Sequence, residues 1–364
     1  MQLKKIIETI EQFAPPSYQE SYDNAGLITG NGEMEITGAL ICLDSTEAVI
    51  DEAIRKNCNL IIAHHPIVFS GIKKLNGKNY VERTIIKAIK NDIAIYAAHT
   101  NLDNVYKGVN HKIAEKLGLT NLKILAPVNG KLRKLVTFAP HNNIDEIRDA
   151  LFEAGAGSIG NYDECSFNTE GIGTFRGNDK SKPTIGEKGK RQNEPETRIE
   201  VIYEMIREKA LLSALRKSHT YEEIAYDIYP LENSYQHIGS GMIGEFDQPK
   251  KPDDFLSHVK STMKTQCIRH TALLPGNIKT VAVCGGSGSF LLSQAIMAGA
   301  QAFITADFKY HQFFDADNRI LIADIGHYES EQFTVEIFEN LIRQKFNTFA
   351  VHLSETNTNP VNYF

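Results

Sequence analysis

Both ends of this chain alternate short, wholly apolar segments with amphipathic helical segments, and this alternation limits the possible folds more than any other feature. Near the N-terminus, the apolar segments 38–44, 60–66 and 93–99 are each followed by a helical pattern. Strands that are apolar throughout are buried on both faces, as in parallel sheets covered by helices on each side. The N-terminal region is therefore predicted to be α/β.

The same alternation returns after residue 277. Strand-like and helical segments follow one another in the order 279–286, 290–299, 301–307, 319–326, 328–345 and 348–354. We therefore predict one α/β domain with a parallel-rich sheet flanked by helices, built from residues 1–127 and 271–364. Two separate α/β domains would give a similar pattern.

The middle of the chain, residues 128–270, has a different pattern. Strand-like segments and helical segments alternate there in the order 131–137, 143–155, 196–204, 209–218 and 225–231, with a polar, Gly-, Lys- and Pro-rich stretch at 176–196. The polar stretch indicates a long exposed hairpin or loop. A β-α-β-β-α-β order is typical of ferredoxin-like domains, so we predict an inserted ferredoxin-like α+β domain.

Charge and composition exclude several classes of protein. The formal net charge of −6 makes nucleic acid an unfavourable partner, because binding it requires an excess of basic residues. No apolar run reaches the roughly 18 residues of a membrane span, and residues 1–13 read as an amphipathic helix instead of a signal sequence. The five cysteines are odd in number and form no C-x-x-C pair, which indicates reduced thiols in a cytoplasmic protein.

Two adjacent histidines, His64 and His65, directly follow an apolar segment. They are expected at the carboxyl end of a strand, where ligands collect in open α/β sheets. Pro66 favours an extended backbone at His65, so the two rings should diverge and suit two neighbouring metal ions better than one. On their own, they could equally be surface or helix-capping histidines.

Two further strand ends supply similar side chains. His99 ends the next predicted strand, and Asp103 lies four residues beyond it. His327 opens a helix, and Glu331 lies one turn later on the same helix face. Taken singly, Asp103 could be a turn residue, and His327 with Glu331 a surface pair. Taken together, three strand ends are expected to deliver these groups to one edge of one sheet.

The mixed set of imidazoles and carboxylates predicts a catalytic dinuclear metal site. Such ligands suit Zn, Mn or Fe, with Zn the first choice, and the absence of cysteine argues against a closed structural zinc site. Five protein ligands are too few to saturate two ions, so positions remain for water and substrate.

Other polar residues are weaker candidates. Lys309 and His311 follow the apolar segment that ends at Asp307, and they could meet an anionic substrate or shuttle a proton as catalytic residues. Both could also be ordinary surface residues. The glycine-rich turn 285–288 could cradle a phosphate, but it is no dinucleotide fingerprint, because Leu291 stands where the third glycine belongs.

Several motifs along the chain carry a resemblance to a known family. They are YDNAGLITG (22–30), LIIAHHPIVF (60–69), HTNLD (99–103), VAVCGGSGSFL (281–291), TADFKYH (305–311) and DIGHYESE (324–331). The sequence resembles the GTP cyclohydrolase I type 2 homologues, also called the Nif-three-like family of dinuclear metal proteins. FEAGAGSIGNYDECSF (152–167), GIGTF (171–175) and ETRIE (196–200) resemble the PII/CutA-like insert of its long bacterial members. One departure is Tyr22, where the family motif usually begins with Trp.

The resemblance implies a ligand set and an assembly. The implied metal ligands are His64, His65, Asp103, His327 and Glu331, with Glu331 reaching both of two divalent ions per chain. His99 is implied to be a partner of the ligands instead of a ligand. The resemblance also implies a ring-shaped homohexamer whose sites face an interior cavity.

We therefore expect a dinuclear-metal-dependent hydrolase of a phosphorylated or nucleotide substrate. Two cations lower the pKa of a bridging water from 15.7 toward about 7 and neutralise an anionic substrate. The family name implies a sharper version, GTP cyclohydrolase-type ring opening with release of formate. The alternative is a non-catalytic metal-binding scaffold or regulatory protein whose insert senses a small ligand or partner. Nucleic-acid binding through the basic loop 180–191 is the least favoured reading.

Overall fold

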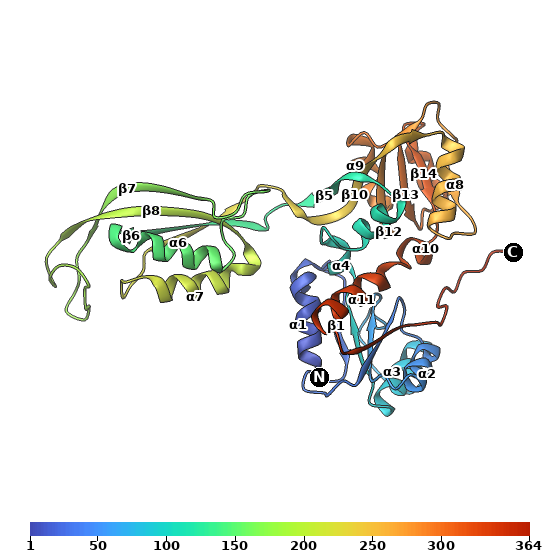
Figure 1. Cartoon of the computed structure of the whole chain (residues 1–364), viewed down its shortest axis with the longest axis horizontal. Helices are drawn as coiled ribbons and strands as arrows, with labels where there is room; N and C mark the ends of the chain where they lie inside the picture. Colours follow the sequence, from blue (N-terminus) through green and yellow to red (C-terminus); the bar gives the residue numbers. More distant parts are fainter. The chain divides into compact units, whose positions relative to one another are not determined.

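The computed structural model describes residues 1–364, which divide into two compact units (Figure 1). The first unit combines both ends of the chain, Met1–Pro127 and Gln236–Phe364, and the second unit is Val128–Tyr235. The fold is mixed α/β, as predicted. None of the helices has the length and apolar character needed to cross a membrane.

One sheet of the first unit has five strands in the order β1-β4-β3-β2-β15. Their bounds are β1 Gly26–Thr29, β2 Gly38–Cys42, β3 Leu60–Ala63, β4 Ala94–Ala97 and β15 Ala350–Leu353. All neighbours are parallel except β1 and β4. Every residue of β2, β3 and β4 is buried, as their uninterrupted apolar sequences predict.

Helices cover both faces of this five-stranded sheet. They are α1 Leu3–Phe13, α2 Glu47–Arg55, α3 Tyr80–Lys90 and α11 Thr334–Lys345, with a short 3₁₀ turn η1 at Pro16–Tyr18. Apolar side chains of α2 and α3, such as Val49 and Ile85, pack in one cluster with Leu40 and Ile61 of the sheet. The N-terminal ends of α2 and α3 are capped by Thr46 and by Asn79 (the latter accepting from Glu82 N, 2.9 Å).

A second sheet in the first unit has six strands in the order β11-β14-β13-β12-β10-β5. Their bounds are β5 Thr120–Val128, β10 Tyr235–Lys250, β11 Arg269–His270, β12 Ile278–Ser287, β13 Ala302–Ala306 and β14 Leu321–Asp324. β12, β13 and β14 run parallel to one another, whereas β10 is antiparallel to β12 and β11 is antiparallel to β14. The five-stranded sheet does combine strands from both chain ends, because β15 pairs with β2. The apolar strands β12, β13 and β14, however, pair within this second sheet, so the first unit contains two sheets where one was predicted.

Short helices complete the first unit. They are α4 Thr100–Asn104, α5 Val109–Leu117, α8 Pro252–Thr262, α9 Leu292–Met297 and α10 His327–Glu331, with the 3₁₀ segments η4 Ser289–Leu291 and η5 Tyr310–Ala316. The predicted helix 328–345 is in fact two helices, α10 and α11, and the break between them falls directly after Glu331.

The second unit has the predicted β-α-β-β-α-β element order. Its elements are β6 Leu132–Pro140, η2 His141–Asn143, α6 Ile144–Glu153, β7 Ser166–Phe175, β8 Gln192–Glu204, η3 Met205–Arg207, α7 Glu208–Ser218 and β9 Tyr226–Leu231. The strands form one antiparallel sheet in the order β7-β8-β6-β9. Side chains from both helices, including Ile147 and Leu211, pack with Leu135 and Val201 of this sheet.

The second unit ends earlier than the predicted boundary at residue 270. Residues 236–270 belong to the first unit, where β10 pairs with β12 and α8 contacts α5. The sequence did not show where the second unit ends, because the pairing of β10 with β12 depends on the tertiary fold.

Candidate metal centre

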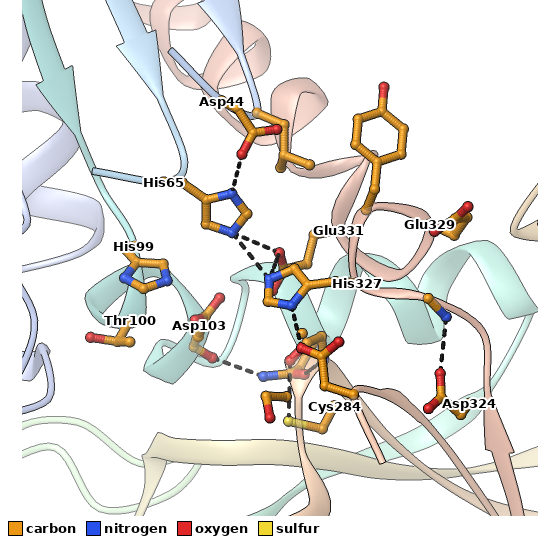
Figure 2. A pocket seen from close by; sticks show the side chains of 18 of the residues that line it. Asp44, His65, His99, Thr100, Asp103, Cys284, Asp324, His327, Glu329 and Glu331 are labelled. Carbon is orange, nitrogen blue, oxygen red and sulfur yellow. Dashed lines mark hydrogen bonds and ion pairs between the residues drawn. The ribbon is translucent and has the colours of Figure 1, made fainter. Parts of the chain in front are cut away.

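Histidine and carboxylate side chains from both sheets of the first unit converge at one place (Figure 2). His64 and His65 directly follow β3, and Asp103 lies on α4, just beyond β4. His327 and Glu331 lie at the two ends of α10, which follows β14. The predicted ligands are therefore brought together where the carboxyl ends of strands from two sheets meet, instead of along one edge of one sheet.

These five residues form two groups that share Glu331. In the first group, His64 Nε2 lies 3.6 Å from Asp103 Oδ1 and 3.8 Å from Glu331 Oε1. In the second, His65 Nε2 and His327 Nε2 lie 3.0 Å and 3.2 Å from Glu331 Oε2, and 3.3 Å from each other. Each carboxylate oxygen of Glu331 therefore faces a different group of donors.

The first group has the character of a cation site. His64 Nε2 and Asp103 Oδ1 are buried, yet neither has a hydrogen-bond partner. Unpaired buried polar atoms are rare and costly, so each requires an explanation. Donor atoms that bind a tetrahedral Zn at 2.0–2.1 Å lie about 3.3 Å apart, close to the spacings in both groups. The residues present therefore fit a pair of divalent cations.

The histidines of the centre share one orientation: Nδ1 is held by an oxygen, which leaves Nε2 to point inward. The pairs are His64 with Ala98 O (2.9 Å), His65 with Asp44 Oδ1 (2.8 Å), His327 with Asp307 Oδ2 (2.6 Å) and His99 with Asp23 Oδ1 (2.8 Å). An acceptor at Nδ1 fixes the tautomer and leaves the Nε2 lone pair for a metal ion. Metal-binding histidines are commonly arranged in this way.

Sequence reasoning missed the three aspartates that hold these rings. Asp44 and Asp307 each directly follow a buried, mainly apolar strand segment, the same position that identified His64 and His65. That signal could have found them. Asp23 lies outside any strand and gave no such signal, because it reaches His99 only through the tertiary fold.

His99 lies against the predicted ligands. Its ring centroid is 5.3 Å from those of both His64 and His65, and the three histidines form a further possible metal-binding group. The Phe69 ring packs edge-on against His99 at 5.8 Å. His99 therefore presents Nε2 to the centre, and this geometry suits a ligand as well as a partner of the ligands.

The acidic and imidazole side chains of the centre shift one another's pKa values. Burial and the neighbouring Glu331 raise the pKa of Asp103 to about 7. Burial alone would raise the pKa of Glu331, but contacts with His327 and His65 hold it well below its usual range. Burial opposes protonation of His65, yet contacts with Asp44 and Glu331 raise its pKa to about 9. The charge states of these imidazoles and carboxylates therefore depend on one another, so binding of a cation here would be linked to release of protons.

A cavity of 870 Å³ opens onto the centre, and carboxylates dominate its charged lining. The acidic residues that line it are Glu20, Asp44, Asp103, Asp307, Asp324, Glu329 and Glu331. Arg269 is the one lysine or arginine among the lining residues. A cavity of this size suits a small-molecule ligand, and this excess of carboxylates suits bound cations.

Comparison with known proteins identifies the family. The family model described as Duf34/NIF3 (NGG1p interacting factor 3) matches residues 1–360. The chain belongs to the Duf34/NIF3 family. The chain is 38% identical over 366 aligned positions to the GTP cyclohydrolase 1 type 2 homolog of Bacillus subtilis, covering 99% of this chain and 98% of that protein.

Solved structures agree with this Duf34/NIF3 assignment. A Bacillus cereus protein related to NIF3 is 36% identical with a TM-score of 0.88, covering 100% of this chain and 99% of that one. A Staphylococcus aureus protein is 30% identical with a TM-score of 0.80 and the same coverage. The resemblance predicted from the motifs is thus confirmed.

In this Duf34/NIF3 chain, the glycine-rich turn packs against the ligands. Gly286 has a φ of +58°, and an added Cβ would lie 2.5 Å from Glu331 Oε1 and 3.2 Å from His327 Nε2. The Gly286 N–H donates to Ser330 Oγ at 2.9 Å. The absence of a side chain at this position therefore leaves room for the two groups of donors.

The structure does not bring Lys309 and His311 to the centre. Both residues are exposed at η5, neither lines the cavity, and the His311 ring packs on Tyr310 and Phe314. The lining cation is Arg269. Sequence reasoning missed it because β11 is a two-residue strand inside the segment assigned to the insert.

Proposed function

We propose that this Duf34/NIF3 chain is a dinuclear-metal-dependent hydrolase that acts on a phosphorylated or nucleotide substrate. The observation that carries this proposal is Glu331, whose two oxygens face two separate groups of buried donors. The acidic 870 Å³ cavity beside it offers space for a small substrate. The relatives' name, GTP cyclohydrolase 1 type 2 homolog, supports GTP ring opening with release of formate as the first reaction to examine.

Each residue of the centre has a role in this proposal. His64 and Asp103 would hold one ion, His65 and His327 the other, and Glu331 both, with Zn as the first choice and Mn or Fe as alternatives. Two divalent ions held there would lower the pKa of a water molecule and neutralise charge on the group under attack. His99, oriented by Asp23, would present Nε2 to hold a proton during the reaction.

Elemental analysis and turnover test the proposal together. We expect two ions per chain in freshly purified protein. Protein loaded with Zn, Mn or Fe should then hydrolyse GTP or a general phosphoester, with formate as a second product to measure. His64→Ala and Glu331→Ala should abolish turnover. His352→Ala is the matched control, because His352 is exposed on β15 and does not line the cavity.

The outcomes separate the proposal from its alternative. Two bound ions without turnover on any substrate would favour a non-catalytic metal-binding scaffold or regulatory protein. Wild-type protein that binds no divalent ion would contradict both. The second unit supplies none of the cavity-lining residues, so a sensing role for it would concern a different ligand. We propose that this unit is ferredoxin-like, on the support of its element and strand order.

A further inference from the structure

We propose that Arg269 forms an anion-binding subsite in the cavity beside the candidate metal centre, where it takes a phosphoryl group of the substrate. This inference rests on the proposed function, because it assigns a substrate group to the same cavity. Among the residues that line the cavity, Arg269 alone carries a lysine or arginine charge. Sequence reasoning had placed that role on Lys309 and His311, which lie outside the cavity lining.

The guanidinium of Arg269 is anchored at one end and open at the other. Nη2 donates to the backbone oxygen of Phe308 at 2.9 Å and forms an ion pair with Asp324. The guanidinium carbon lies 5.4 Å from the centroid of the Phe313 ring, which supports its face. Nε and Nη1 donate to no protein group, and the side chain is 55% exposed. A fixed, planar fork with two free donors matches the geometry of a phosphoryl oxyanion.

Asp324 connects this fork to the loops of the metal centre. It is only 4% exposed, and besides Arg269 it accepts from Phe308 N at 3.0 Å and Gly326 N at 3.2 Å. Phe308 follows Asp307, and Gly326 precedes His327. The buried carboxylate of Asp324 thus fixes the position of the guanidinium relative to His327 and to Asp307, the aspartate that orients the His327 ring.

The electrostatics of the cavity leave few places for an anion. Seven carboxylates line it, namely Glu20, Asp44, Asp103, Asp307, Asp324, Glu329 and Glu331. A phosphorylated substrate is repelled by this lining except at bound metal ions and at Arg269. The ions and the guanidinium can therefore hold two different parts of one substrate: the reacting atoms and a phosphoryl group.

Arg319 provides a matched control for Arg269. Its side chain is 57% exposed and is paired with an aspartate, Asp317, at 3.6 Å, but it does not line this cavity. We would measure binding of GMP and of guanosine by titration calorimetry to zinc-loaded wild-type, Arg269→Met, Arg269→Lys and Arg319→Met proteins. The zinc content of every sample would be determined by elemental analysis.

We expect GMP affinity to fall about 10- to 100-fold in Arg269→Met, the loss of one or two charge-assisted hydrogen bonds. The fall should be smaller in Arg269→Lys and absent in Arg319→Met, while guanosine binding and zinc content stay unchanged. Wild-type GMP affinity in Arg269→Met would overturn the subsite, as would an equal loss for guanosine and GMP. The subsite would also be overturned if zinc-loaded wild-type protein bound no GMP.

Two further controls keep the result interpretable. Arg269→Met leaves the buried Asp324 without its cation, so Arg269→Met/Asp324→Asn removes that charge if the single variant does not fold. The double variant should also bind GMP weakly, and wild-type affinity in it would overturn the subsite. Wild-type protein without bound zinc would instead refute the proposed metal centre, so the two failures are distinguishable.

Discussion

Asp44 fixes the orientation of His65 without belonging to either group of donors. Its Oδ1 accepts from His65 Nδ1 at 2.8 Å, and its Oδ2 accepts from Thr358 Oγ1 at 2.6 Å. An amide at this position can turn its NH₂ toward the ring and favour the tautomer that carries its proton on Nε2, the atom that would bind metal.

We therefore expect Asp44→Asn to lower the affinity for one of the two ions about 10- to 100-fold. The affinity for the other ion should stay near the wild-type value. Competition against a chromophoric zinc chelator measures the two affinities. Asp315→Asn, at an exposed position on η5, is the control and should change neither. Equal weakening of both ions by Asp44→Asn would show that Asp44 does not act through His65 alone.

Gly286 makes a second residue-scale prediction, because its missing side chain leaves space for Glu331 and His327. Gly286→Ala should lower the metal content below two ions per chain. Gly118→Ala is the matched control: Gly118 has a φ of +73° with open space around its Cβ position. Both variants should lose about 1 kcal/mol of stability to the left-handed backbone. Full metal content in a folded Gly286→Ala protein would contradict the packing role.

At the scale of elements, α2 is tied to the segment after β15 through Glu52. This buried carboxylate accepts from Ser354 Oγ (2.7 Å), Glu355 N (2.8 Å) and Thr356 Oγ1 (2.6 Å), and it pairs with Lys56 (2.8 Å). Burial alone would raise the pKa of Glu52, but these partners hold it well below its usual range. The ionised form therefore stabilises the fold.

A lowered carboxyl pKa contributes stability above the unfolded-state pKa of about 4.3 and loses it as the pH falls through the folded-state pKa. We expect Glu52→Gln to lower the free energy of unfolding by about 1–3 kcal/mol at pH 7 and by progressively less below pH 4. Urea denaturation at several pH values measures this. Glu47→Gln, on the exposed face of the same helix, should have little effect. A pH-independent loss in Glu52→Gln would contradict this account.

Local sequence predicts individual elements well where one face or both faces are buried. The strands β2, β3 and β13 were predictable because every residue in them is apolar or small and buried. Which strand pairs with which was not predictable. β15 lies beside β2, more than 300 residues away in sequence, and no local periodicity records that pairing.

The same distinction holds within the site. His64, His65 and Glu331 were found because their positions follow from the ends of elements. Asp23 and Arg269 were missed because their roles depend on tertiary contacts, with His99 and with the loop after β13. The sequence therefore identifies the side chains that reach the centre more readily than it identifies the residues that orient those side chains.

At the scale of the whole molecule, we propose that the second unit is dispensable for metal binding. All five proposed ligands lie in the first unit. β5 and β10, which flank the second unit in sequence, are neighbours in one sheet, so a short linker can join their ends. Replacing residues 128–235 with a Gly/Ser linker should leave two ions per chain by elemental analysis. Loss of both ions from a folded protein of this kind would contradict the proposal.

Assembly is a separate whole-molecule proposal. From the family resemblance, we propose that the protein forms a ring-shaped homohexamer. Light scattering coupled to size-exclusion chromatography measures the molar mass and therefore the number of subunits. The shortened protein provides the comparison, since a change in its subunit number would assign the assembly contacts to the second unit.

The division of the ligands between the two ends of the chain has a consequence for biosynthesis. His64, His65 and Asp103 leave the ribosome well before His327 and Glu331, which follow more than 200 residues later. A nascent or truncated polypeptide therefore lacks the carboxylate that both ions share. In the proposed centre we therefore expect chains that stop before residue 331 to retain less metal than chains that include it.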